Sequence, residues 1–236
     1  MSHPIIAFDL DGTLVDTAPD LIDTLNAVFA EKGVPELAFD AARDMIGGGV
    51  KVLLERGLSA QGQVVTSEEL DDLYDDYLQR YAARVADRSR PFPGVEAALD
   101  KLAALGYRFA VCTNKLEWLS VRLLDALGLS ARFEAICGQD TFGIQKPDPE
   151  MLRRTITKAG GDPAYAIMVG DSATDVNTAR AARLPVVAVD FGYTEIPVQL
   201  LGPDRIISHF DALPKVITEL VPVQRHGAVA RPDASA

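Results

Sequence analysis

The sequence predicts an α/β protein with a doubly wound, parallel-sheet (Rossmann-like) core into which a helical domain is inserted. Short apolar segments alternate with helical segments from residue 89 to 222, which is typical of a parallel sheet covered by helices on both faces. Residues 17–88 interrupt this alternation with helical patterns alone. We therefore predict a core of residues 1–16 and 89–222, a helical domain at 17–88, and a disordered tail at 223–236, where large apolar residues are few.

The individual elements follow from periodicity and from turn residues. Residues 4–8 form a short apolar run that predicts a buried strand, and comparable runs lie at 107–112, 135–137, 166–169, 186–189 and 205–207. Leu21, Leu25 and Phe29 recur at helical spacing, and Gly33 ends that pattern. By the same criteria, helices are predicted at 18–32, 39–46, 50–58, 67–81, 95–105, 118–127, 150–160 and 175–183.

Composition and charge exclude several classes of protein. The net charge of −11 over 236 residues argues against nucleic acid as a partner, because phosphate backbones repel an acidic surface. No apolar run approaches the roughly 18 residues that a membrane span needs. Cys112 and Cys137 lie in apolar runs and are expected to be buried and reduced. We therefore expect a cytoplasmic protein, either a monomer or a homodimer, that acts on a small molecule.

Two carboxylates directly follow the first predicted strand. Asp9 and Asp11 are two residues apart, so an extended chain directs both side chains to the same side. Two neighbouring carboxylates repel each other unless a cation lies between them or one is protonated. The pattern therefore indicates a metal site or an acid/base pair, and its alternative is a solvated turn.

Further polar residues follow two other predicted strands or precede a helix. Asp171 and Asp175 come after the strand at 166–169, where they could also cap a helix. Thr113 and Asn114 come after the strand at 107–112, and they could bind phosphate oxygens or form a turn. Lys146 lies in a loop entering a helix. Because ligands bind at the carboxyl ends of parallel strands, we expect these groups to meet at one edge of the sheet.

These segments, in this order, resemble the haloacid dehalogenase superfamily of phosphohydrolases over nearly the whole chain. The residues that carry the resemblance are Phe8–Leu14, Thr113–Asn114, Lys146 and Gly170–Asp175. The domain at 17–88 is similar to the small helical cap of that superfamily. The resemblance implies a phosphatase in which Asp9 attacks phosphorus and becomes phosphorylated, while Asp11 protonates the leaving alcohol and then deprotonates water.

The resemblance also implies the remaining site residues. Mg²⁺ would be held by the Asp9 carboxylate, the Asp11 backbone carbonyl and Asp171, since it prefers oxygen ligands. Asp175 would orient Lys146 or a metal-bound water. The phosphate would be bound by Thr113, Asn114 and Lys146, and Lys146 would also offset the charge between phosphate and nucleophile.

A finer resemblance is to the bacterial phosphoglycolate phosphatases, in residues 9–21, 46–56 and 93–95. It implies hydrolysis of 2-phosphoglycolate to glycolate and phosphate. The alternatives within the superfamily are a sugar-phosphate phosphatase, a phosphomutase, or a phosphonate hydrolase that uses a cap lysine, Lys32 or Lys51, as a Schiff base. Relatives of the last kind carry arginine where this chain has Lys146.

The glycine run at 47–49 has two interpretations. It is either a cap loop that closes over a small substrate, with Gly48 as a substrate-binding candidate, or a turn between two helices. Two alternatives lie outside the superfamily's chemistry. A non-catalytic binding module predicts a damaged site, but every expected catalytic residue type is present. A dinucleotide-binding enzyme predicts Gly-x-Gly-x-x-Gly after the first strand, and that motif is absent from the sequence.

Overall fold

A computed structural model describes residues 3–223 and contains a six-stranded sheet in which every pair of neighbouring strands is parallel. The strands are β1 (Ile5–Phe8), β4 (Arg108–Cys112), β5 (Ala135–Cys137), β6 (Ala166–Gly170), β7 (Val186–Val189) and β8 (Arg205–Ile207). Their order is β5-β4-β1-β6-β7-β8, so the chain winds outward in both directions from β1. The predicted doubly wound α/β core is therefore confirmed.

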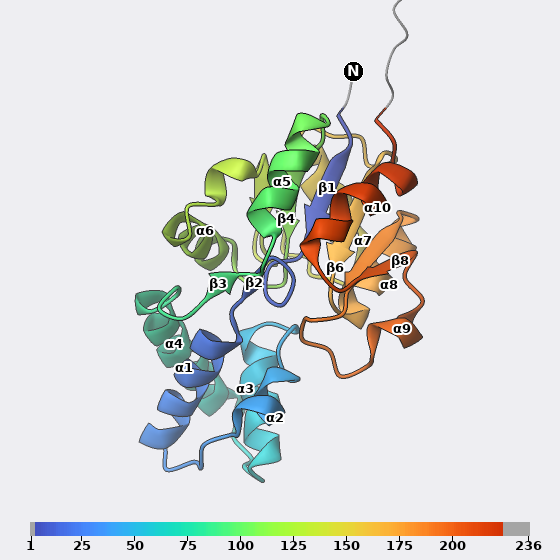
Figure 1. Ribbon diagram of the computed structural model, residues 1–236. Coiled ribbons are helices and arrows are strands. Elements are labelled where there is room, and N and C mark those ends of the chain that lie inside the picture. The colour runs from blue at the N-terminus through green and yellow to red at the C-terminus, as the bar shows by residue number, and fades with distance from the viewer. Residues whose placement is uncertain (1–2, 224–236) are drawn as a thin grey trace, which may run out of the picture.

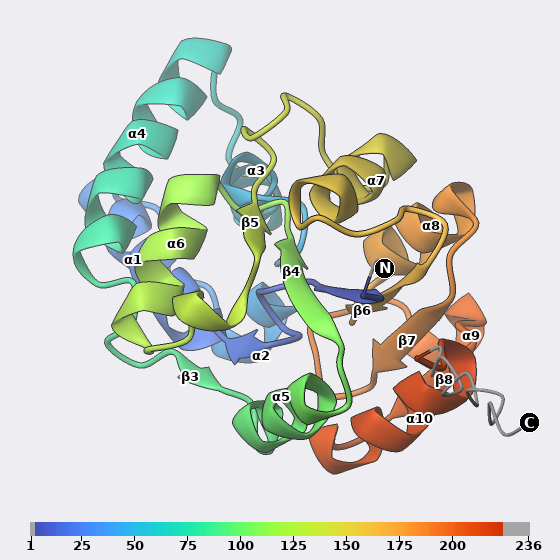
Figure 2. The same ribbon diagram turned by 90° about the horizontal axis from the view of Figure 1, so that it is seen from above.

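Helices cover both faces of this sheet (Figure 2). Alternate residues of β1 point to opposite faces, as expected for a strand. Ile5 and Ala7 pack beneath α7 (Pro149–Lys158) and α8 (Ala173–Ala182), whereas Ile6 and Phe8 belong to the larger core beneath the other helices. Those helices are α5 (Val95–Ala104), α6 (Glu117–Ala126) and α10 (Leu213–Leu220). A short helix, α9 (Val198–Leu201), lies beside α8.

Four helices form a separate layer beyond the carboxyl ends of the strands, below the sheet in Figure 1. They are α1 (Ala18–Glu31), α2 (Phe39–Arg43), α3 (Val50–Ala60) and α4 (Ser67–Ala83). We call residues 17–88 the cap and the rest of the described chain the core. The cap has its own apolar interior, which includes Leu25, Phe29, Leu54, Leu58, Leu73 and Tyr77. The predicted helix at 39–46 is shorter in the structure, because residues 44–48 form a turn toward the core.

The two chain segments that connect cap and core pair with each other. Val15–Asp16 (β2) and Arg90–Pro91 (β3) form a two-stranded antiparallel sheet. Beside it, the buried carboxylate of Asp20 accepts hydrogen bonds from the backbone N–H groups of Arg88 and Ser89 and from the Ser89 hydroxyl, at 2.6–3.0 Å. One side chain of α1 thus fixes the return segment against the outgoing one.

The structure bears on three further expectations, which concern membrane spans, the two cysteines and the C-terminal tail. Residues 3–223 include no helix that is both long and apolar enough to cross a membrane. Cys112 and Cys137 are buried and free, as predicted. Most of the predicted tail, residues 224–236, lies outside the described residues, while Val223 packs half-buried against the core.

Candidate active site

Three neighbouring strands each deliver a polar residue to the edge of the sheet that faces the cap. Asp9 follows β1, Thr113 follows β4 and Asp171 follows β6. Because β1 lies between β4 and β6, Asp9 takes the central position. The Asp9 backbone N–H donates to the Val169 carbonyl at 2.9 Å, so the sheet ladder continues up to the site.

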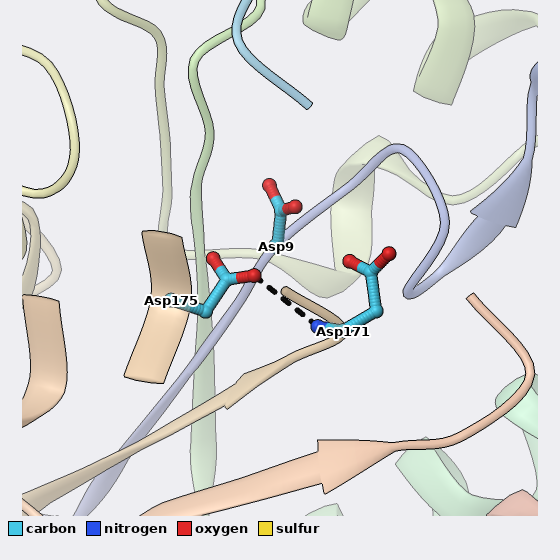
Figure 3. A group of neighbouring side chains, drawn as sticks. All are labelled: Asp9, Asp171 and Asp175. Atoms are coloured by element: carbon cyan, nitrogen blue, oxygen red, sulfur yellow. Dashed lines mark hydrogen bonds between the residues drawn. The ribbon is translucent and has the colours of Figure 1, made fainter. Parts of the chain in front are cut away.

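Asp9, Asp171 and Asp175 bring their carboxylates together (Figure 3). One oxygen from each lies within 4.8 Å of the others, and all three residues are buried. Burial disfavours the charged form and raises the pKa of Asp9 to about 6, with the Asp175 charge adding to the effect against the opposing charge of Lys146. Burial and the same neighbouring carboxylates also raise the pKa of Asp171 well above its usual range.

Lys146 inserts its ammonium between two of these carboxylates. Its Nζ lies 2.8 Å from Oδ1 of Asp9 and 2.6 Å from Oδ1 of Asp175, and its side chain is 2% exposed. Burial alone would lower the pKa of Lys146, but the charges of Asp175 and Asp9 outweigh this and raise it. Lys146 is therefore a permanent positive charge beside Asp9.

Asp171 is held from two sides. The Thr13 hydroxyl donates to Oδ1 at 2.8 Å, and the Tyr193 backbone N–H donates to Oδ2 at 2.6 Å. Gly12 allows this close approach: its φ is +85°, and a Cβ there would lie 2.5 Å from Asp171 Oδ2. The glycine after Asp11 is thus required by the packing of Asp171.

Asp175 caps α8 from within the site. Its Oδ2 accepts from the backbone N–H of Asp171 at 3.2 Å (Figure 3). The same oxygen accepts from the backbone N–H of Ser172 at 3.1 Å and from the Ser172 hydroxyl at 2.8 Å. Its Oδ1 is bound by Lys146. Both oxygens of Asp175 thus have partners, three donors on Oδ2 and Lys146 on Oδ1, so Asp175 is better placed to orient Lys146 than to bind a metal ion.

The site fits a divalent cation. Three carboxylates and one ammonium leave two excess negative charges in a buried space. Oδ1 of Asp9 is buried and, among residues 3–223, has the Lys146 ammonium at 2.8 Å as its one polar contact. Carboxylate oxygens are the ligands that Mg²⁺ prefers. Asp9 and Asp171 are therefore the side chains that could hold the ion, and the Asp11 carbonyl stays a predicted third ligand.

Asn114 uses its side chain to position Lys146. Its Nδ2 donates to the Lys146 carbonyl at 3.1 Å, and its Oδ1 accepts from the Lys146 N–H at 2.8 Å. Thr113 Oγ1 accepts from the N–H of Lys115 at 3.2 Å, which leaves the hydroxyl proton free to be donated. Both residues line the cavity described next, so their assignment to phosphate binding stays a prediction.

A cavity of about 30 Å³ lies between cap and core, and Asp9 is one of its lining residues. Its core wall is formed by Asp9, Asp11 and 113–115, and its cap wall is formed by Leu21, Ile46, Gly47, Gly49, Val50 and Leu53. Gly48 lines a neighbouring hollow together with Asp44 and Arg56, so its role in substrate binding is a prediction that this geometry does not support directly. Lys51 faces outward and pairs with Asp71 at 2.5 Å, with both side chains more than half exposed.

The sequence interpretation missed Lys115 and Tyr81. Lys115 Nζ lies 3.1 Å from Oδ1 of Asp11 and 2.9 Å from the Tyr81 hydroxyl, and it stacks 4.4 Å from the Tyr81 ring centroid. Both residues are buried, and Tyr81 belongs to the cap. The available signal was that Lys115 directly follows Thr113–Asn114 at a strand's carboxyl end. Its contact with Tyr81, 34 residues away, has no local sequence signature.

Comparison with known proteins identifies the family. Residues 6–189 match the model of the haloacid dehalogenase-like hydrolases. The chain belongs to this family. Its sequence is 49% identical to a phosphoglycolate phosphatase of Mesorhizobium japonicum (93% of this chain, 96% of that protein) and 47% identical to one of Caulobacter vibrioides (92% and 91%). The predicted superfamily, and the resemblance to these bacterial phosphatases, are confirmed.

The fold comparison agrees. A crystal structure of a predicted phosphoglycolate phosphatase from Haemophilus somnus 129pt superposes with a TM-score of 0.85 at 30% identity, covering 92% of this chain and 98% of that one. Family and relatives together indicate that this haloacid dehalogenase-like hydrolase is a phosphoric monoester hydrolase.

Proposed function

We propose that this enzyme hydrolyses 2-phosphoglycolate to glycolate and phosphate, with Mg²⁺ as cofactor and a phosphorylated Asp9 as intermediate. The central support is the position of Asp9, whose buried carboxylate lies at the cavity beside Lys146 and two residues from a second cavity-lining acid, Asp11. The substrate is proposed from the names of the relatives that cover nearly the whole chain.

In the first step, an Asp9 oxygen forms a bond to phosphorus as the bond to the leaving oxygen breaks, and Asp11 gives that oxygen a proton. In the second step, water attacks the phosphoryl group, returns a proton to Asp11 and releases phosphate, so Asp9 is restored. Lys146 offsets the charge between the anionic substrate and the anionic nucleophile. The side-chain amide of Asn114, which is hydrogen-bonded to the Lys146 backbone, keeps Lys146 in place for this task.

Asp9, Asp171 and the Asp11 carbonyl would hold the magnesium ion. When bound, Mg²⁺ neutralises negative charge on the transferring phosphoryl group. The cluster of three buried carboxylates supports this assignment. Asp175 orients Lys146 through the bond at 2.6 Å.

The cap wall favours a small substrate. Four apolar side chains and two glycines face the phosphate site across a cavity of about 30 Å³. A phosphonate hydrolase that forms a Schiff base needs a lysine amine in contact with the substrate. Lys51 does not meet this need, because it is paired with Asp71 at the surface.

The free, buried cysteines fit the predicted cytoplasmic location, where thiols stay reduced.

The test is phosphate release with Mg²⁺ from a panel of phosphate esters that includes 2-phosphoglycolate, hexose phosphates and nucleoside monophosphates. We expect the highest kcat/KM for 2-phosphoglycolate and loss of all activity in Asp9→Asn. If a sugar phosphate gives the higher kcat/KM and Asp9→Asn is inactive, the assignment of 2-phosphoglycolate as substrate is wrong, but the proposed mechanism stands. An active Asp9→Asn variant would disprove the nucleophile.

A further inference from the structure

Lys115 is a buried cation at the cavity that the two chemical steps do not use. Its side chain is 3% exposed, so it is held almost entirely within protein. Within the described part of the chain, the cavity is lined by one cationic side chain, that of Lys115, because Lys146 is not among the lining residues. A buried lysine is costly unless it is paired, and Asp11 provides that pair.

The partners of Lys115 place it on the leaving-group side of the site. Its Nζ contacts both oxygens of Asp11, at 3.1 and 3.2 Å, and Asp11 is the group assigned to protonate the leaving oxygen. In 2-phosphoglycolate, a single methylene group separates that oxygen from the carboxylate carbon. A cation that touches the acid next to the leaving oxygen is therefore within reach of the substrate's carboxylate.

The opposite wall has no charged side chain. It consists of Leu21, Ile46, Val50, Leu53 and two glycines of the cap, and it includes the N-terminus of α3, whose N-cap is Gly49. A carboxylate turned toward it would find backbone N–H groups but no full positive charge. Lys115 supplies that charge. An ammonium has three donors, and among residues 3–223 those of Lys115 meet the two oxygens of Asp11 and the Tyr81 hydroxyl, so a substrate carboxylate would take the place of one Asp11 oxygen.

Tyr81 holds the ammonium at this place. Its hydroxyl lies 2.9 Å from Nζ, and its ring stacks against the charge with 4.4 Å between Nζ and the centroid. Tyr81 is itself fully buried and stacked on Tyr77. Tyr81 of the cap therefore fixes the position of the Lys115 ammonium. An ammonium in a fixed position can recognise a carboxylate that lies at a fixed distance from the phosphate.

We propose that Lys115 binds the carboxylate of the substrate and so makes the enzyme selective for small phosphate esters that carry a carboxylate one carbon from the ester oxygen. This proposal rests on the function proposed above. It assigns specificity to a residue of the core, positioned by Tyr81 of the cap.

The test compares 2-phosphoglycolate with 2-phosphoglycolamide, in which an uncharged amide of similar shape replaces the carboxylate. We expect the wild-type enzyme to prefer the carboxylate by about 30-fold in kcat/KM, the size of one charge-assisted hydrogen bond. In Lys115→Met the preference should fall to about 3-fold or less, with most of the loss in KM for the carboxylate. Lys115→Arg, which keeps the charge, should retain part of it. Lys51→Met, a cap lysine at the surface, is the matched control and should keep the wild-type preference.

Two results would overturn the proposal. Equal use of both substrates by the wild-type enzyme would show that no cation recognises the carboxylate, and this comparison needs no variant. A Lys115→Met variant that loses the same factor on both substrates would show that Lys115 acts only through Asp11. These two results differ from those expected if the proposed function itself is wrong. In that case, neither 2-phosphoglycolate nor 2-phosphoglycolamide is cleaved at a rate near that of the best phosphate ester in the panel described above.

Discussion

At the scale of single residues, the site depends on one ammonium that balances two buried carboxylates. The Lys146 ammonium contacts the carboxylates of Asp9 and Asp175, and it is hardly hydrated because its side chain is 2% exposed. Removing it would leave an anionic nucleophile facing an anionic substrate. The charge of Lys146 therefore serves the reaction and also neutralises buried carboxylates in the folded protein.

The variant Lys146→Met should lower kcat/KM by about 100-fold or more, because charge stabilisation at the transferring phosphoryl group is lost. Steady-state kinetics with Mg²⁺ measures this. Lys158→Met is the matched control: it lies at the end of α7, it is half exposed, and its contact with Glu117 is 3.7 Å long. The account is contradicted if both variants keep wild-type kinetics.

The pKa of Asp9 gives a pH prediction for the metal-free protein. The folded-state pKa of about 6 lies above the ordinary value of 3.8, so the folded state binds this proton more tightly than the unfolded state does. The free energy of unfolding should therefore fall as pH rises from 3.8 to about 6. Asp171, whose pKa is also raised, acts with the same sign.

Magnesium should reverse this trend, because it binds the deprotonated carboxylates. Thermal unfolding with and without Mg²⁺, from about pH 5 to about pH 8, measures the effect. We expect the increase in Tm caused by Mg²⁺ to grow as pH rises through about 6. The same increase at every pH would contradict the assignment of Asp9 as a ligand, and Asp9→Asn should weaken the effect, with Asp171 responsible for what remains.

At the scale of elements, the connection between cap and core depends on Asp20. Its carboxylate, 2% exposed, binds two backbone N–H groups and one hydroxyl of residues 88–89, where the cap returns to β3. Asp20→Ala should lower the free energy of unfolding by about 3 kcal/mol, since these donors stay buried without partners. Urea unfolding checks this.

Asp23→Ala is the control for that variant. Asp23 pairs with Arg88 on the same segment, but both side chains are largely exposed. A surface pair of this kind contributes little, so we expect a change of about 0.5 kcal/mol or less. Equal effects of the two variants would show that the buried carboxylate has no special role at the connection.

The elements were largely predictable because their signals are local. Strands such as 135–137 and 186–189 were predicted with their observed bounds, since apolar runs between turn residues are sufficient evidence. The pair β2 and β3 was missed, because two residues carry no periodicity. Helix α2 ends at Arg43 instead of 46, since the chain turns there to bring 46–49 over the cavity.

The site was predictable where topology alone places it. The carboxyl ends of β1, β4 and β6 meet, so Asp9, Thr113 and Asp171 come together once the strand order is known. Hydrogen-bond partners were not predictable in the same way. Asn114 was assigned to phosphate, yet its amide binds the Lys146 backbone, and Lys115 was overlooked because its partner Tyr81 lies in another domain.

At the scale of the whole molecule, the cap lies against the core with a small cavity between them. This cavity of about 30 Å³ has room for about two water molecules, so we expect the cap to move when a phosphate ester binds. Arg43 of α2 holds this arrangement: its Nη2 donates to the Phe191 carbonyl at 2.8 Å, and its guanidinium lies 5.0 Å from the Tyr193 ring centroid.

Arg43→Met should therefore raise KM by about 5-fold, because closure over the substrate loses one hydrogen bond and one cation–π contact. It should also increase the radius of gyration in solution scattering. Arg84→Met is the matched control, since Arg84 pairs with Asp87 within the cap surface. Unchanged KM and scattering in Arg43→Met would show that this contact does not hold the cap.

The central claim, that Asp9 is the phosphorylated nucleophile, is tested most directly in the variant Asp11→Asn. An aryl phosphate needs no acid to expel its leaving group, whereas hydrolysis of the intermediate needs Asp11 as a base. We therefore predict that rapid mixing of this variant with 4-nitrophenyl phosphate and Mg²⁺, followed by mass spectrometry of its peptides, finds one phosphoryl group on Asp9. Release of 4-nitrophenolate with no phosphoryl group on Asp9, or with one on another residue, would contradict the account.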